Sequence, residues 1–174
     1  MQEGNNIYLR PLVEDDFNDR YLTWFKDAEV TRFLEARNIT REDAIKHLHD
    51  GEDGKNWRLY AICEKATERH IGNIKIGPID WKNGVSDLVT VIGERDAWGK
   101  GYAREAIKRG MEIAFDELHI RKLSASIVSG NTGSIKAYTA AGFTVEATLK
   151  DQYKDAAGQM YDKVFVSAFA PLKQ

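Results

Sequence analysis

The feature that most constrains this chain is a glycine-rich loop that joins a strand pattern to a helix pattern. The run Leu88–Ile92 is apolar and β-branched, which is typical of a central strand, and Gly101–Asp116 keeps one apolar stripe at helical spacing. Gly99 and Gly101 lie in the loop and allow its backbone to approach a ligand closely. Because the first N–H groups of a helix have no internal partners, this arrangement predicts an anion-binding site.

Two well-known anion-binding loops do not fit this segment. A P-loop needs Gly-Lys-Ser/Thr after a four-residue gap, and a dinucleotide-binding loop needs a third glycine in an early βαβ unit. Neither pattern is present here. Lys100 adds a positive charge to the loop. The alternative to an anion-binding site is a tight turn that binds nothing.

The remaining patterns alternate irregularly along the chain. This order favours a mixed α/β fold with partly antiparallel pairing, and it differs from the strict alternation of a doubly wound sheet. We expect strands at residues 7–12, 57–64, 70–80, 85–93, 122–128, 143–153 and 160–169, and helices at 13–25, 40–51, 101–116 and 131–141.

Composition excludes several classes of protein. The 174 residues suit one domain spanning residues 1–174, and a net charge of −2 argues against a nucleic-acid partner. The single cysteine, Cys63, excludes an internal disulfide and a multi-cysteine zinc site, and it suits the cytoplasm. We find no cluster with metal-ligand spacing, no targeting signal and no apolar run long enough for a membrane span, so we expect neither a metal nor a membrane partner.

A second motif lies about thirty residues after the loop, and it comprises Asn131, Ser134, Tyr138 and Gly142-Phe143. Together with Trp-Gly-Lys-Gly-Tyr-Ala at 98–103, it resembles the two signatures of the GNAT superfamily of N-acetyltransferases. The likeness extends over residues 7–169 and is greatest to the branch that acetylates ribosomal-protein N-termini (Rim-type). The loop departs from the family at Asp96, where Gln or Arg is usual, so we do not count Asp96 as a phosphate ligand.

The resemblance implies a fold, a co-substrate and a set of binding residues. The fold would be a central mixed sheet of about seven strands with about four helices, in which the fourth and fifth strands splay apart. Acetyl-CoA would lie between these two strands as co-substrate. The residues implied in its binding are Val91 and Ile92 on the strand, Trp98, Gly99, Lys100, Gly101, Tyr102 and Ala103 in the pyrophosphate loop, and Asn131 and Ser134 at the second motif.

The resemblance also suggests catalytic residues. Tyr138 matches the residue that faces the thioester sulfur, where its hydroxyl can donate a proton; packing in the core is the alternative. Glu94 is the first candidate for the base that deprotonates the amine, followed by Asp80 and Glu35. We expect His47, His49, His70 and His119 to be surface or structurally satisfied histidines, and Cys63 to be a buried structural cysteine.

The sequence leaves several acceptors open. Aromatic and basic residues of the first two helices, the turn after the third strand and the last hairpin would suit a nucleotide-linked amino sugar. A protein or peptide N-terminus is the equal alternative, and a polyamine or a CoA-binding regulatory module without turnover are further ones. Exposed strand edges in the last hairpin leave a homodimer open. The aromatic candidates are Trp24, Phe25, Phe33, Trp57, Trp81 and Tyr153, the basic ones Arg32, Arg37, Lys82 and Lys154, and the carboxylates Glu29, Glu35, Asp80 and Asp87.

Overall fold

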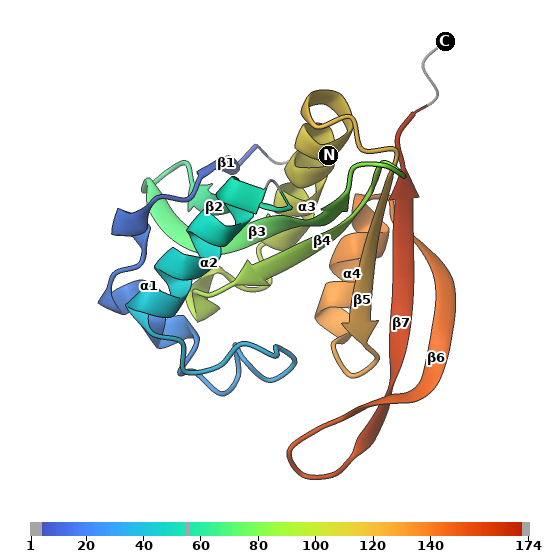
Figure 1. Ribbon diagram of the computed structural model, residues 1–174. Coiled ribbons are helices and arrows are strands. Elements are labelled where there is room, and N and C mark those ends of the chain that lie inside the picture. Colours follow the sequence, from blue (N-terminus) through green and yellow to red (C-terminus); the bar gives the residue numbers. More distant parts are fainter. Residues whose placement is uncertain (1–4, 55, 172–174) are drawn as a thin grey trace.

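A seven-stranded mixed sheet with strand order β1-β2-β3-β4-β5-β7-β6 organises the chain. In this computed structural model, which describes residues 5–54 and 56–171, β1 to β4 form an antiparallel ladder and β5, β7 and β6 form a second one (Figure 1). The expected mixed α/β fold is confirmed. The strands are β1 (Ile7–Pro11), β2 (Arg58–Glu64), β3 (Arg69–Asp80), β4 (Val85–Ile92), β5 (Lys122–Val128), β6 (Thr144–Lys154) and β7 (Met160–Phe169).

Helices cover both faces of the sheet, and the alternation of β2 shows this directly. Ala61 and Cys63 pack with residues of α1 (Asp19–Trp24) and α2 (Arg41–Gly54), whereas Ile62 joins the core formed with α3 (Tyr102–Glu112) and α4 (Thr132–Ala141). Cys63 is buried as expected. No helix within the described residues is long and apolar enough to cross a membrane.

The single helix expected over residues 13–25 is wrong. A 3-10 turn at Glu14–Asp16 precedes α1, and the two are separated at Phe17, whose ψ of 50° is not helical. Asn18 then begins α1, because its side chain accepts a hydrogen bond from the N–H of Tyr21 at 3.2 Å. A good cap inside an apolar helical pattern therefore restarts the helix.

Two other helix ends differ from expectation. Gly51 does not end α2, which continues to Gly54; the indole of Trp57 lies so close to Gly51 that a Cβ would clash with it. Gly51 is therefore needed for close packing rather than for a turn. The helix expected to reach Asp116 ends as an α-helix at Glu112 and continues as a π-helical turn over Ile113–Glu117.

Asp16 ties β1 to the turn before α1. Its carboxylate accepts hydrogen bonds from the Arg10 guanidinium at 2.6 and 2.7 Å and from the N–H of Val13 at 2.9 Å. Burial pushes the pKa of Asp16 upward, but these donors outweigh burial and hold the pKa below its ordinary value.

We expect Asp16→Asn to lower the free energy of unfolding in urea at pH 7 by about 2 kcal/mol, because a charge-assisted pair is lost. Since the folded pKa of Asp16 is lowered, its contribution is complete above about pH 4 and is lost as the pH falls through the folded-state pKa. The exposed neighbour Asp15→Asn is the matched control. Equal stability of the two variants would contradict this account.

Candidate active site

The two halves of the sheet separate between β4 and β5. These parallel strands pair only over Val85–Asp87 and Lys122–Ser124, although β4 continues to Ile92 and β5 to Val128. Figure 1 shows the two strands diverging beyond this point. The expected splay of the fourth and fifth strands is confirmed, and it leaves one edge of β4 without a strand partner.

The backbone of β4 shows which residue faces this opening. The carbonyls of Leu88 and Ile92 point away from β3, because they accept hydrogen bonds from the Tyr138 hydroxyl at 2.6 Å and from the Trp98 indole at 2.9 Å. The carbonyl of Val91 points the other way, toward Gly72 of β3. Since a strand alternates, the N–H and carbonyl of Thr90 face the opening. Thr90 was missed in the sequence because period-two alternation alone does not identify the unpaired edge.

A cleft of about 710 Å³ begins in the splay and extends beneath the segment that joins α1 to α2. It brings Val91 of β4 together with Asn131, Ser134 and Tyr138, which belong to α4 and its N-terminal cap. Asn131 also caps α4, since its side chain accepts a hydrogen bond from the N–H of Ser134 at 3.2 Å. Asn131 therefore both caps α4 and lines the cleft.

The glycine-rich loop has the geometry of an open anion cradle. Gly99 and Gly101 have φ values of 74° and 83°, and a Cβ at either position would meet no atom within 4 Å. Gly101 begins α3 without any side-chain cap, so the N–H groups of the first turn stay available. The residues present therefore fit a diphosphate. Gly101 separates Lys100 from Tyr102, and Ala103 follows in the first turn of α3. The Tyr102 hydroxyl donates to Glu64 at 2.7 Å.

Asp96 lies beside this loop, but its carboxylate pairs with Arg69. Its carboxylate accepts two hydrogen bonds from Arg69, at 2.8 and 3.0 Å, which lower its pKa. The bidentate pair ties the start of β3 to the turn before the loop. Asp96 thus shapes the loop in place of binding phosphate.

Tyr138 lies at the narrow end of the splay and is 3% exposed. Its hydroxyl donates to the carbonyl of Leu88, and the Thr90 hydroxyl is 3.4 Å away. Desolvation raises the pKa of Tyr138 well above the ordinary value, so the phenol stays protonated at neutral pH. The ring also packs against Phe143 at 5.1 Å between centroids, so the residue belongs both to the core and to the cleft.

Three titratable side chains from different elements line the cleft beyond Tyr138: Asp87 of β4, Lys75 of β3 and His47 of α2. Desolvation raises the pKa of Asp87 and lowers those of Lys75 and His47, and the Lys75 ammonium moderates the rise at Asp87. Asp87 is open to the water of the cleft, yet enough protein surrounds it to disfavour its charge. The sequence offered Asp87 as one of four carboxylates for an acceptor pocket, and the cleft lining includes it.

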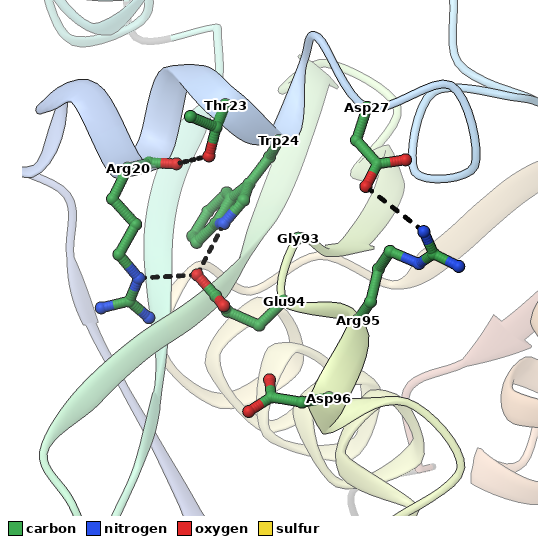
Figure 2. A pocket seen from close by; sticks show the side chains of 8 residues that line it. All are labelled: Arg20, Thr23, Trp24, Asp27, Gly93, Glu94, Arg95 and Asp96. Carbon is green, nitrogen blue, oxygen red and sulfur yellow. Dashed lines mark hydrogen bonds and ion pairs between the residues drawn. The ribbon is translucent and has the colours of Figure 1, made fainter.

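Glu94 lies in a second, more open pocket of about 420 Å³ (Figure 2). One of its carboxylate oxygens accepts from the Arg20 guanidinium at 2.6 Å and from the Trp24 indole at 2.8 Å. Figure 2 shows the side chain turned toward these two donors, with Arg95 directed at Asp27. The structure does not bring Glu94 together with Tyr138 in the lining of the cleft.

The predicted acceptor residues divide among several places. Phe25, Phe33, Tyr153 and Glu35 line the cleft, whereas Trp24 lines the second pocket. Asp80 caps the turn after β3, where it accepts from Asn83 at 2.7 and 3.0 Å. The other predicted aromatic and basic residues, and Glu29, are absent from the cleft lining, and no group of three His, Cys, Asp or Glu within the described residues could hold a metal ion.

Comparison with known proteins gives the family. The model of the acetyltransferase (GNAT) domain matches residues 6–144. The chain belongs to the GNAT acetyltransferase family. The GNAT chain is 30% identical to the uncharacterized N-acetyltransferase p20 of Bacillus licheniformis, over 97% of this chain and 93% of that relative. It is 24% identical to the spermidine N(1)-acetyltransferase of Vibrio cholerae, over 75% of this chain and 69% of that protein.

Solved structures show the same fold. A spermidine N-acetyltransferase from Vibrio cholerae in complex with CoA and spermine matches with a TM-score of 0.85 at 17% identity, and the match covers 95% of this GNAT chain and 96% of that chain. The family match and the sequence relatives establish this protein as an acetyl-CoA-dependent N-acetyltransferase. The ribosomal-protein branch is not among the relatives named, and neither they nor the fold match identify the acceptor.

Proposed function

We propose that the chain transfers the acetyl group of acetyl-CoA to a primary amine while both substrates occupy the 710 Å³ cleft. The observation that carries the proposal is the continuity of this cleft. It connects the open edge of β4 and Tyr138 to the part of the cleft that lies beneath the α1–α2 segment. Two substrates held in one cleft react without a covalent enzyme intermediate, and their alignment supplies part of the rate acceleration.

The binding residues for acetyl-CoA are proposed from the same geometry. The backbone N–H groups of Gly99 to Ala103 would hold the diphosphate at the start of α3, with Trp98 and Lys100 at its rim. Thr90 exposes the unpaired edge of β4 to the pantetheine arm, and the side chain of Val91 lines the cleft. The Ile92 carbonyl, on the same edge, already accepts from the Trp98 indole, so Ile92 borders the arm without offering that oxygen. Asn131 and Ser134 contribute polar atoms from the opposite wall.

The proposed chemistry needs one proton donor and one proton acceptor. Bound acetyl-CoA would supply a thioester carbonyl for attack: the C–N bond to the amine forms, the C–S bond breaks and CoA leaves as a thiolate. Tyr138 is proposed to donate its hydroxyl proton to the sulfur, because burial keeps the phenol protonated beside the open edge of β4. The N–H of Thr90 can donate to the carbonyl oxygen as negative charge develops there.

Asp87 is proposed as the acceptor of the amine proton, and Glu94 stays a prediction to be tested beside it. The cleft contains Asp87, whereas Glu94 already accepts two hydrogen bonds in another pocket. A raised pKa also makes a carboxylate a better base near neutral pH.

We expect Asp87→Asn to lower kcat at pH 7 by about 100-fold and Glu94→Gln to lower it by less than about threefold. Only ionised Asp87 accepts a proton, so wild-type kcat should fall as the pH drops through a pKa above that of an ordinary aspartate. Asp87→Asn should lose this acid limb. A larger loss in Glu94→Gln, with the acid limb kept in Asp87→Asn, would return the role to Glu94.

The test of the function itself is acetyl transfer to a panel of amines, measured as CoA released and N-acetyl product formed. A regulatory module would bind acetyl-CoA and yield neither. The panel should include a peptide with the N-terminus of a ribosomal protein, a nucleotide-linked amino sugar and spermidine. Acetylation of the peptide alone would favour the Rim-type branch.

A polyamine acceptor is the second candidate, and the similarity in sequence and in fold to spermidine acetyltransferase of Vibrio cholerae favours it. A cytoplasmic location also belongs to the proposal, supported by the unpaired, buried thiol of Cys63.

A homodimer stays open, since β6 lies at the edge of the sheet with nearly every residue exposed. Sedimentation of the purified chain would test it.

A further inference from the structure

The part of the cleft beneath the α1–α2 segment, which we call the acceptor chamber, has mostly apolar walls. They come from the α1 region, the α1–α2 segment and β2, and include Tyr21, Phe25, Phe33, Leu34, Ile39 and Leu59. Such walls favour an apolar or aromatic body over one that carries several charges. A polyamine would need carboxylates spaced along its length.

The charged groups of the cleft are few, and most are already matched. Asp43 lies in the first turn of α2 and accepts hydrogen bonds from the N–H and the hydroxyl of Thr40, both at 2.9 Å. Asp87 shares its electrostatic environment with the Lys75 ammonium, which lies on the neighbouring strand and also contacts His47 at 3.4 Å. These groups are therefore poorly placed to neutralise additional ammonium groups of a ligand.

The other two charged residues of the cleft are Glu35 and Lys163, and neither has an ion-pair partner among the described residues. The lining thus contains three carboxylates, Glu35, Asp43 and Asp87, and two ammonium groups, those of Lys75 and Lys163. Its net charge is one negative charge, because the lowered pKa of His47 keeps that ring neutral at pH 7. One ammonium group balances this charge, whereas three would leave an excess and meet Lys163 as a like charge.

We infer that the acceptor is a primary monoamine with an apolar or aromatic body, and that Lys163 helps to exclude polyamines. The inference rests on the proposed function, since it concerns the acceptor chamber of the same cleft. In this arrangement the amine faces Asp87 and the body lies against the aromatic walls. A second ammonium group at the far end of the acceptor would lose water without gaining a carboxylate.

The test compares acceptors of equal length. With acetyl-CoA saturating, kcat/KM should be at least about tenfold higher for hexylamine than for hexamethylenediamine or spermidine, and high for phenethylamine. A kcat/KM for spermidine equal to or above that for hexylamine would overturn the inference and leave the proposed function intact. Absence of any N-acetyl product, with acetyl-CoA bound, would instead refute the proposed function.

A charge reversal gives an independent test. Lys163→Glu should raise the ratio of kcat/KM for hexamethylenediamine to that for hexylamine by at least about tenfold, because the like charge becomes an opposite one. The ratio does not depend on how tightly the variant holds acetyl-CoA. Lys150→Glu makes the same change at an exposed position of β6 outside the cleft lining and should leave the ratio unchanged. An unchanged ratio in Lys163→Glu would remove Lys163 from the inference.

Discussion

Replacing Gly99 with glutamate is expected to weaken acetyl-CoA binding by at least about 100-fold, equivalent to ~2.7 kcal/mol. The loop now offers unpaired N–H groups at the start of α3 and open space around both glycines. A carboxylate there would compete for the same N–H groups and repel the diphosphate. Isothermal titration with acetyl-CoA measures the effect.

The control for this variant must reproduce its backbone strain. Gly99 has a φ of 74°, a conformation that side chains with a Cβ rarely adopt. Gly158 has a φ of 85° in the turn between β6 and β7, outside the loop and the cleft. Gly158→Glu should bind acetyl-CoA with the wild-type Kd. Equal affinity of Gly99→Glu and wild type would show that the diphosphate is held elsewhere.

Tyr138→Phe is expected to lower kcat by about 100-fold or more while leaving the Kd for acetyl-CoA within about threefold. The substitution removes only the hydroxyl, so the ring can still pack against Phe143. It leaves the carbonyl of Leu88 without its donor, so a loss of stability of about 1–2 kcal/mol should accompany it.

The two effects of Tyr138→Phe can be separated. Urea unfolding gives the stability, and kcat is measured where both proteins remain fully folded. A purely structural tyrosine would change the urea midpoint and leave kcat at the wild-type value. That outcome would contradict the role of Tyr138 as proton donor.

Most of the fold could be predicted because its signals are local. The boundaries of β5 and β7 agree with the expected ranges. In β5 the apolar residues Leu123, Ala125 and Ile127 alternate with polar ones, a local pattern that specifies a half-buried strand without help from distant residues. The helix ends were less predictable. Whether Gly51 ends a helix or accommodates Trp57 depends on a contact between two elements, and no local pattern shows it.

The candidate site likewise has parts that the local sequence reveals and parts that depend on tertiary structure. The loop around Gly99 and Gly101 and the motif from Asn131 to Tyr138 are contiguous in sequence, so their spacing could suggest a role. The grouping of Asp87, Lys75 and His47 depends on strand pairing and on how α2 crosses the sheet, which spacing does not reveal. The end of β4 made Glu94 a reasonable candidate, yet Arg20 and Trp24 reach it from α1.

A crystal structure of the chain with CoA would show directly where the thiol end of CoA lies. We expect the diphosphate on the N–H groups of Gly99 to Ala103 and the pantetheine arm between β4 and β5. We also expect the sulfur within hydrogen-bond distance of the Tyr138 hydroxyl. A sulfur outside the β4–β5 splay, or a diphosphate away from the start of α3, would contradict the proposed site.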